Sequence, residues 1–360
     1  MLTSKDIKGW GAYAEFEGPL YWGKWKYTLP AAPSDNDKVI ATITATEGGA
    51  YDAVNCYDIC IFTGGLIQWC ERGQYSVSSM LGAVAEKEPD LIQTCLRPAL
   101  QAAGVTFRRS DKGWRFYFND GRLVMTEAEQ RQQFFGSPTV GKKGTWQEAN
   151  KELARTWAAC FINVWQSEQA RKTQVEFTAR GLITNFVFGE ARTQLFGAGS
   201  PKENAGLAGA VRAAYISFAA NNPAKTLAAY KTAQAAGLPM WTQPWAVEVL
   251  KQMTYAPKIA IYPERYNKIR PVLERLYGVD LPDMAEHLKG TGVSAEALMG
   301  AKEMQECLIK LGYNLGPAGA DGIVGAKTRA ALMEFQVRNA MPADGELSMD
   351  TAQKLREQTK

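Results

Sequence analysis

The sequence predicts a mainly α-helical protein of the α+β class that divides into two domains. Apolar residues recur at helical spacing through most of the 360 residues, whereas strand-like alternation is confined to two short stretches, 51–69 and 114–122. The helical pattern thins between residues 278 and 300, where glycine and proline punctuate the chain. We therefore expect an N-terminal domain over 1–280, a linker over 281–299 and a C-terminal domain over 300–360.

The first well-marked helix is predicted to end at Glu47. Ser34-Asp35-Asn36-Asp37 offers several N-cap side chains, and the apolar residues of 39–43 then form a helical stripe. Gly48-Gly49 follows Glu47 at once and suits a helix C-cap.

Residues 51–69 predict a β-hairpin or a small irregular sheet, because aromatic, apolar and polar side chains alternate there. This stretch carries Asp58 and Thr63 and leads into a Gly-Leu-Ile-Gln turn at 65–68. The second strand-like stretch turns at Asp120-Gly121. A helix-end glutamate is thus followed by an aspartate and a threonine on a hairpin and then by a glycine-led turn.

Further helices are predicted downstream. Thr145-Trp146-Gln147-Glu148 has the pattern of a capping box before a long amphipathic helix that reaches Val164. Helices over 211–220 and 224–236 are separated at Asn221-Asn222-Pro223, since the residue before a proline disfavours the helical conformation.

After the linker, three short helices are predicted. Ser294 is a candidate N-cap, and an apolar stripe over 304–311 precedes Gly312, which ends the first helix. The second helix is predicted over 326–339, and Ser348 caps the third. A unit of about 60 residues is small for an independent core but adequate as an appended module.

Composition restricts the chemistry. The single histidine, His287, lies in a polar stretch that we expect to be a solvated linker, while zinc hydrolases and serine or cysteine nucleophiles usually need imidazoles. We therefore expect no metal and no cofactor, and catalysis by carboxylates if the chain is a hydrolase.

Charge and hydropathy exclude other classes. The net charge is +4 and no long basic run occurs, so nucleic-acid binding has no support. No apolar run approaches the roughly 18 residues of a membrane span. The first six residues already include Lys5 and Asp6 and do not form a secretory signal. We expect a monomer.

Six cysteines occur, at positions 56, 60, 70, 95, 160 and 307. Their spacing matches no repeated Cys-x-x-Cys metal motif, although the first three could approach one another across the hairpin. Without an export signal the compartment of synthesis is reducing, so we expect free thiols.

Several motifs occur in the C-terminal segment in a consistent order: Leu311-Gly312-Tyr313, Asp321-Gly322-Ile323-Val324-Gly325, Lys327-Thr328, Ala330-Ala331, Phe335-Gln336, Asp344-Gly345, and Thr351 with Leu355. Together, over about 300–356, they resemble the small peptidoglycan-binding domain of cell-wall hydrolases. The resemblance implies that peptidoglycan is the partner of this module. The alternative is a bare three-helix packing domain without ligand affinity.

A second resemblance covers about 47–69. Glu47, Asp58 and Thr63 look like the glutamate–aspartate–threonine pattern of phage-type lysozymes, with slightly different spacings. Gly65-Leu66-Ile67-Gln68 is similar to the Gly-Leu-Met-Gln turn of goose-type lysozymes and soluble lytic transglycosylases. The resemblance implies a lysozyme-like helical domain with a small β-hairpin region.

Glycosidase chemistry assigns roles to these residues. Cleavage needs a protonated carboxylic acid beside the leaving oxygen, which we assign to Glu47, because a helix C-terminus and desolvation both raise a carboxyl pKa. Asp58 would stabilise the oxocarbenium ion or position water, which Thr63 would hold. Gln68, Trp69 and Tyr57 are the candidates for substrate contacts.

Each assignment has a structural alternative. Glu47 is otherwise an exposed helix-end glutamate, Asp58 a turn cap with Asp52 as its rival, and Thr63 a plain strand residue. Trp69 is otherwise part of the aromatic core. Most of the other glutamates in helical or near-helical stretches, Glu71, Glu168, Glu176 and Glu190, are expected to be ordinary solvated charges; the alternative is that one of them completes the site.

The expected function is that of a bacteriolytic glycosidase which cleaves between N-acetylmuramic acid and N-acetylglucosamine, as in a modular phage endolysin. One alternative is a lytic transglycosylase, which leaves 1,6-anhydro products and needs no second carboxylate. An amidase or peptidase that acts on the stem peptide is disfavoured by the single histidine. A non-catalytic wall-binding protein is the alternative from a different class. We expect the protein in the host cytoplasm before it reaches the cell wall; a virion-associated lysin and a secreted effector are the alternatives.

Overall fold

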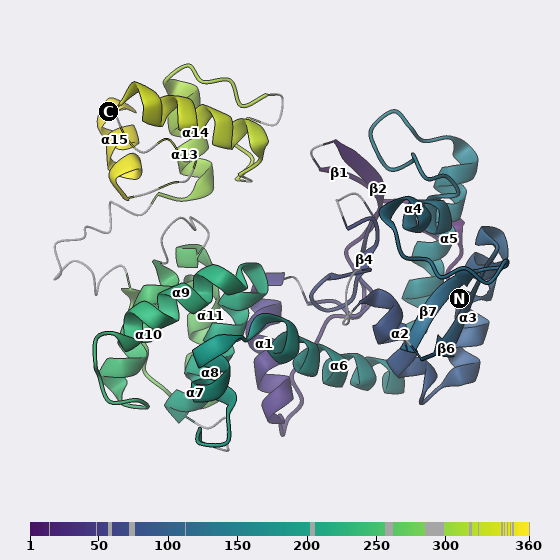
Figure 1. Cartoon of the computed structure of the whole chain (residues 1–360), viewed down its shortest axis with the longest axis horizontal. Coiled ribbons are helices and arrows are strands. Elements are labelled where there is room, and N and C mark those ends of the chain that lie inside the picture. The colour runs from purple at the N-terminus through teal and green to yellow at the C-terminus, as the bar shows by residue number, and fades with distance from the viewer. Residues whose placement is uncertain are drawn as a thin grey trace. The chain divides into compact units, whose positions relative to one another are not determined.

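The protein is mainly α-helical with small antiparallel sheets, as expected (Figure 1). The computed structural model describes the chain except residues 14, 48, 57–59, 72–75, 112, 202–205, 256–261, 285–298, 317–318, 323, 340, 342, 344, 346, 348 and 360. The chain divides into two units, Met1–Asn185 and Phe186–Lys360.

The first unit is an α+β structure. Its elements are η1 (Ser4–Asp6), β1 (Trp10–Tyr13), β2 (Phe16–Tyr21), α1 (Asp35–Glu47), β3 (Val54–Asn55), β4 (Thr63–Gly64), β5 (Trp69–Cys70), α2 (Val77–Ala85), α3 (Pro89–Ala103), β6 (Val105–Ser110), β7 (Gly113–Phe118), α4 (Glu127–Phe135), α5 (Glu148–Val164) and α6 (Glu168–Phe186), which ends at the boundary.

The second unit is helical in the residues described. Its elements are α7 (Gly189–Phe196), α8 (Gly206–Asn221), α9 (Pro223–Gln234), α10 (Gln243–Thr254), α11 (Tyr262–Tyr277), α13 (Ala301–Lys310), α14 (Ala326–Arg338) and α15 (Met349–Thr359). In the part of the chain that the structure describes, no helix is long and apolar enough to cross a membrane.

A five-stranded antiparallel sheet organises the first half of the first unit. Its strands follow chain order, β1-β2-β3-β4-β5, and the register pairs Leu20 with Asn55, Val54 with Gly64, and Gly64 with Trp69. The last three strands confirm the small irregular sheet predicted over 51–69. The hairpin of β1 and β2 was not predicted, because its short strands carry charged and glycine residues that weaken the alternation.

An aromatic cluster forms the core beneath this sheet. Phe62 stacks on Phe134 with ring centroids 4.7 Å apart, and the Phe134 ring lies 5.0 Å from that of Trp157. Phe161 lies one helical turn beyond Trp157 on α5 and contacts Phe62 at 5.5 Å. The predicted amphipathic helix is therefore confirmed. Its predicted capping box is wrong, because Thr145 hydrogen-bonds within its own turn and α5 begins at Glu148.

A second hairpin, β6–β7, covers α2. Gly82 allows the close approach, since a Cβ there would lie 2.4 Å from the side chain of Trp114. The predicted strand around 114–118 is confirmed, and the chain turns at Gly121 with φ of +88°.

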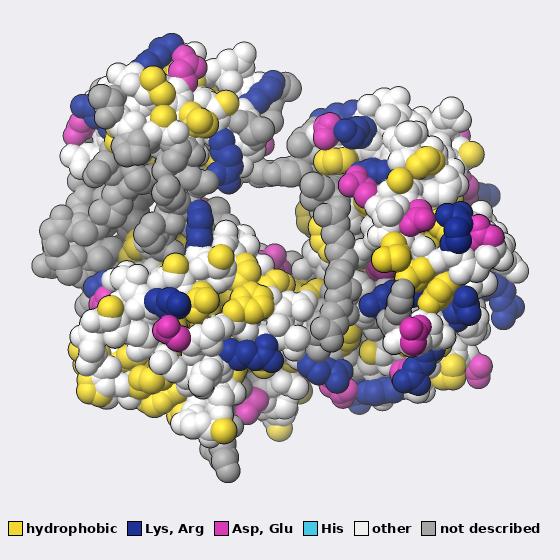
Figure 2. Space-filling model, viewed as in Figure 1, with side chains coloured by type: hydrophobic (Ala, Val, Ile, Leu, Met, Phe, Trp, Pro, Cys, Tyr) yellow, Lys and Arg dark blue, Asp and Glu magenta, His cyan; other side chains and the backbone are white. Residues whose placement is uncertain are grey.

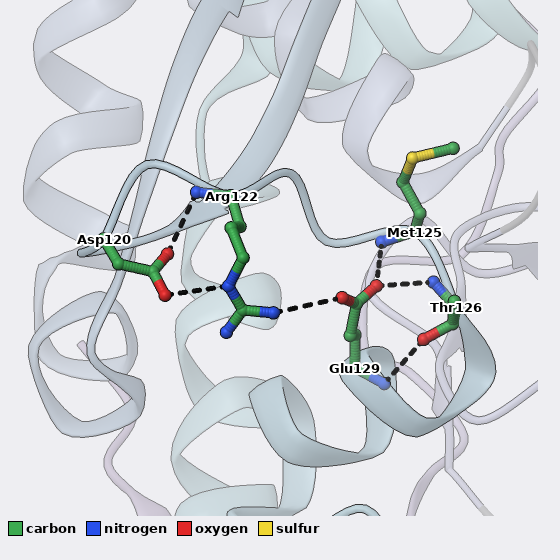
Figure 3. Close-up of polar contacts among 5 residues, drawn as sticks. All are labelled: Asp120, Arg122, Met125, Thr126 and Glu129. Carbon is green, nitrogen blue, oxygen red and sulfur yellow. Dashed lines mark hydrogen bonds and ion pairs between the residues drawn. The ribbon is translucent and has the colours of Figure 1, made fainter.

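The start of α4 is held by a capping box that the sequence analysis did not identify. Figure 3 shows that one oxygen of the Glu129 carboxylate accepts the backbone N–H groups of Met125 and Thr126, at 3.0 and 2.9 Å. The Thr126 hydroxyl accepts the Glu129 N–H in return at 3.2 Å, and Arg122 joins Glu129 to Asp120. These hydrogen bonds from Thr126 and Met125 lower the pKa of Glu129.

We predict that Thr126→Ala lowers the free energy of unfolding by about 1 kcal/mol, the usual cost of losing an N-cap. The loss should shrink as the pH falls through the lowered pKa of Glu129, because the protonated carboxyl no longer supports the box. Urea titrations at several pH values measure both effects. Thr156→Ala is the control, since that hydroxyl bonds only to its own helix; equal losses in the two variants would contradict the assignment.

Two helices of the second unit, α8 and α9, follow the predicted pattern, whereas α7, α10 and α11 were not predicted. The break between α8 and α9 falls at Asn222, whose side chain caps the Lys225 N–H at 3.1 Å before Pro223 opens α9. Tyr262 of α11 lies at the same break and donates its hydroxyl hydrogen to the Phe218 carbonyl of α8 at 2.9 Å. The predicted separation of these helices is thus confirmed.

The three C-terminal helices surround a small core of their own. Met304, Leu308, Leu332, Phe335 and Leu355 are its completely buried members. Two buried glutamines hold its turns: Gln305 accepts the Gly322 N–H at 2.6 Å, and Gln336 accepts the Gly345 N–H at 2.8 Å. Three predicted helices are confirmed, although α13 begins at Ala301 and the candidate caps Ser294 and Ser348 lie outside the described residues.

Surface charge is mixed on the face drawn in Figure 2, where acidic side chains lie close to many of the basic ones. Several ion pairs form within a single helix, such as that of Lys151 with Glu148 at 2.8 Å. Exposed pairs of this kind contribute roughly 0–1 kcal/mol each.

Candidate functional site

Glu47 lies at the end of α1, as predicted. The helix begins with a reciprocal cap in which Ser34 N–H donates to the Asp37 carboxylate at 2.9 Å and Asp37 N–H donates to the Ser34 hydroxyl at 3.2 Å. Ile40 and Ile43 on the apolar stripe are completely buried. The packing of this stripe sets the rotation of α1 and therefore the direction of its last residue.

The Glu47 side chain is half-buried and lines a small pocket of about 120 Å³. The pocket is formed by the end of β2, the loop that follows it, β3 and the turn before β5. Its lining residues are Leu20, Tyr21, Trp22, Lys26, Glu47, Ala53, Val54, Asn55 and Gln68. The structure thus brings together two residues predicted from the sequence, Glu47 and Gln68.

The loop at the mouth of the pocket is fixed by Asp52. This carboxylate is buried and accepts the backbone N–H groups of Lys24 and Trp25, at 3.0 and 2.9 Å. Gly23 has φ of +84°, and a Cβ there would lie 2.8 Å from the Asp52 carboxylate. Trp22 remains 71% exposed beside the pocket. Asp52, the rival second carboxylate, therefore holds the loop in this structure.

The Gly-Leu-Ile-Gln turn is held from α6. The buried side-chain amide of Gln174 accepts the Leu66 N–H at 2.8 Å and donates to the Tyr51 carbonyl at 3.1 Å. Gly65 has φ of +85°, and a Cβ there would meet the Gln174 amide oxygen at 2.8 Å. The turn closes on Gln68, whose φ of +57° is uncommon for a residue with a side chain.

Thr63 supports Gln68 rather than lining the pocket. Its buried hydroxyl lies 3.1 Å from both the Asn55 carbonyl and the Gln68 side-chain oxygen, and it can donate its single hydrogen to either. The sequence analysis offered a plain strand residue as the alternative, and Thr63 does lie in β4.

Trp69 lies in the core. It is 5% exposed, and its indole N–H donates to the Thr178 hydroxyl at 3.1 Å. Its ring meets Phe177 edge to face. This is the core packing that the sequence left open, so Trp69 offers no exposed face to a sugar. The other two candidates, Asp58 and Tyr57, lie outside the described residues.

The expectation of free thiols is wrong for one pair. Cys60 and Cys70 form a disulfide with their Cα atoms 5.4 Å apart, because the chain doubles back through β4 and β5. The bridge closes the segment that carries Thr63, Gly65 and Gln68. Cys56, Cys95, Cys160 and Cys307 are buried and take no part in a disulfide among the described residues.

Glu71, next to this disulfide, is a buried carboxyl outside the Glu47 pocket. It accepts the Ser78 N–H at 2.7 Å at the start of α2. Burial raises the pKa of Glu71, while the Ser78 hydrogen bonds and the Arg115 charge oppose the rise. The expectation of a solvated charge is wrong for Glu71, because its side chain is buried and accepts a hydrogen bond from the start of α2.

We predict that Glu71 makes stability depend on pH. Because its folded-state pKa lies above the unfolded value, its favourable contribution is complete below the unfolded pKa and is lost as the pH rises through the folded pKa. Glu71→Gln should therefore gain stability relative to the wild type on going from about pH 4 to about pH 8, by at most about 1.4 kcal/mol per pH unit. Urea unfolding of both proteins measures the difference, and parallel pH curves would contradict the prediction.

Among the pocket residues that the sequence analysis missed are Trp22, Lys26 and Asn55. One signal was present, since Trp22 and Trp25 flank Gly23 in a stretch without helical or strand periodicity. Aromatic residues in such a loop are candidates for ligand contact because core packing does not explain them. Lys26 and Asn55 carried no signal, because only chain pairing brings them to the pocket: Lys26 bridges to Ala50, and Asn55 of β3 pairs with β2.

Comparison with known proteins identifies the C-terminal helices. Residues 300–355 match the family described as "Putative peptidoglycan binding domain". The chain carries a peptidoglycan-binding domain. The resemblance of about 300–356 to this domain, inferred from its motifs, is therefore confirmed, and the C-terminal module associates the protein with the cell wall.

A second similarity is short. The chain is 60% identical over 35 residues to the type VI secretion system spike protein VgrG3 of Vibrio cholerae, which is 10% of this chain and 3% of that relative. No solved structure gives a significant match to the chain.

Proposed function

We propose that the first unit is a lysozyme-like glycosidase that cleaves the bond between N-acetylmuramic acid and N-acetylglucosamine, with Glu47 as the general acid. The observation that carries the proposal is the position of Glu47 on the wall of a pocket with Gln68 and Trp22, in a chain that also has a peptidoglycan-binding domain. The binding domain supplies the substrate class, and the pocket supplies a carboxyl group to act on it.

The pocket residues suit an amino-sugar substrate. The exposed Trp22 ring provides a flat apolar surface for a sugar face, and the side chains of Asn55 and Gln68 can hydrogen-bond hydroxyl or N-acetyl groups. Glu47 would protonate the leaving oxygen, and the fixed loop and turn would keep its neighbours in place.

A lytic transglycosylase is the second candidate, and one observation favours it. Asp52 already accepts two backbone N–H groups, so Glu47 is the carboxylate on the pocket wall among the described residues. A transglycosylase needs only one carboxyl group, which acts first as acid and then as base.

Product chemistry on purified sacculi tests both candidates. A hydrolase releases muropeptides with new reducing ends, whereas a transglycosylase releases 1,6-anhydro products that are lighter by the mass of one water. A protein that binds sacculi and releases neither product is the non-catalytic wall-binding protein considered from the sequence.

We also propose that the protein acts at the cell wall after passing from the cytoplasm in which it is made. The Cys60–Cys70 disulfide supports this proposal, because disulfides persist in oxidising compartments outside the cytoplasm.

A further inference from the structure

The first unit contains a second and larger pocket, of about 390 Å³. It lies between the start of α1, the chain around Tyr27 and Tyr51, and one face of α6 that carries Arg171 and Lys172. None of these four residues was singled out from the sequence as a site residue, and the Glu47 pocket uses none of them.

The acidic side chains of this pocket already have partners. The Asp37 carboxylate accepts the Tyr27 hydroxyl at 2.9 Å and the Ser34 hydroxyl at 2.6 Å. Glu176 pairs with Lys87 at 2.9 Å, and Glu168 pairs with Lys172 at 2.8 Å. The pocket therefore offers few unsatisfied acceptors to a ligand.

Its donors are more available. Arg171 uses one terminal nitrogen to bond the Trp165 and Gln166 carbonyls, at 2.7 and 2.9 Å, and its guanidinium lies 4.6 Å from the centre of the Trp25 ring. These contacts hold the guanidinium in place while the other nitrogens find no acceptor among the described residues. Burial raises the pKa of Tyr51 to about 12, so that its hydroxyl keeps its proton, and that hydroxyl has no partner in the part of the chain described.

The Lys172 ammonium has three N–H donors, so its ion pair with Glu168 leaves donors for a ligand. Together with the fixed guanidinium and the phenol, these donors suit a carboxylate. The rings of Tyr27 and Tyr51, 6.1 Å apart, add a wall against which short aliphatic groups can pack. A small peptide with free carboxylates has both a carboxylate for the donors and short aliphatic side chains for the tyrosine wall.

The two pockets lie on opposite sides of one short pairing of extended chain. Lys26 bridges to Ala50, Tyr27 N–H donates to the Gly49 carbonyl at 2.7 Å, and Tyr51 N–H donates to the Trp25 carbonyl at 2.9 Å. Successive side chains of extended chain point to opposite faces, so Lys26 lines the Glu47 pocket while Tyr27 lines the second pocket.

We propose that the second pocket binds the carboxylate-bearing stem peptide of peptidoglycan while the glycan occupies the Glu47 pocket. This inference rests on the proposed function and adds the peptide to the substrate class. One layer of extended chain is roughly 10 Å thick, and a peptide of four residues reaches about 13 Å when extended. A stem peptide can therefore pass around the edge of the layer from one pocket to the other.

Binding is tested in the full chain carrying Glu47→Gln, so that the probe is not cleaved. With fluorotyrosine incorporated, the fluorine resonance that disappears in Tyr51→Phe is that of Tyr51. The probes are the N-acetylglucosamine–N-acetylmuramic acid disaccharide that carries a stem peptide of four residues and the same disaccharide without a peptide. We expect a saturable shift of the Tyr51 resonance with the peptide probe and none with the peptide-free disaccharide. No shift with the peptide, or the same shift with both probes, would overturn the proposal.

Lys172→Gln should lower the affinity for the peptide probe by about tenfold, as expected for the loss of one charge-assisted contact. The affinity is obtained from the titration of the Tyr51 resonance. Lys151→Gln is the matched control, because Lys151 is also a helical lysine paired with a glutamate on its own helix, outside the pocket. Equal affinities in the two variants would show that Lys172 does not contact the peptide, and would overturn the assignment of this pocket to the stem peptide. Wall lysis by the Glu47→Gln protein would instead refute the proposed catalytic function and leave the binding result to stand by itself.

Discussion

Replacing Glu47 with glutamine should lower the rate at which the protein clears permeabilised cells by at least about 100-fold, the scale of losing a general acid. Glutamine keeps the size and the hydrogen-bonding oxygen of the side chain but cannot donate a proton to the leaving oxygen. The measurement is the initial rate of turbidity loss, together with release of reducing ends from sacculi.

The control for this prediction is Glu86→Gln. Glu86 is also a glutamate at a helix end, the C-cap of α2, but it bonds the Trp114 indole and does not line the pocket. Its variant should clear cells like the wild type. Sedimentation with sacculi should be the same in both variants, since the peptidoglycan-binding domain is unchanged. Wild-type lysis by Glu47→Gln would exclude Glu47 as the acid.

Removal of residues 299–360 should reduce sedimentation with sacculi by at least about tenfold, because the domain raises the effective concentration of the rest of the chain at an insoluble polymer. The three C-terminal helices have their own buried core, so the remaining chain loses no core residue of the first unit. Release of soluble products from short glycan fragments should be retained, because the Glu47 pocket lies entirely in the first unit.

Circular dichroism of the shortened chain is the control for folding. A helical, cooperatively unfolding protein that still sediments with sacculi like the full chain would place wall binding outside the peptidoglycan-binding domain. In that case the first unit itself would hold the polymer.

Local signals determined much of the fold. The cap candidates at 34–37, the apolar stripe and the following glycines were sufficient to predict where α1 begins and ends. Asn222 with Pro223 was sufficient to predict the break between α8 and α9. Such signals act within a few residues, through backbone geometry and hydrogen bonds that neighbouring side chains satisfy. The capping box predicted at Thr145 shows the limit, because a nearby turn competes for the same hydroxyl.

The site depended on tertiary contacts. Glu47 and Gln68 were identified from the sequence. Trp22 lies beside them only because the buried Asp52 carboxylate fixes its loop. Trp69 lies in the core instead, where its indole bonds Thr178. Gln174, more than a hundred residues beyond the turn that it holds, gave no sequence signal for that role.

By itself, the sequence determined the helical class, the identity of the C-terminal domain and the carboxyl group proposed for catalysis, since each is encoded by neighbouring residues. Only the tertiary structure decided which side chains surround that carboxyl group and that Cys60 and Cys70 are joined. The reason is that strand pairing and helix packing bring together residues far apart in the chain, and no local pattern specifies which side chains then face a pocket and which face the core.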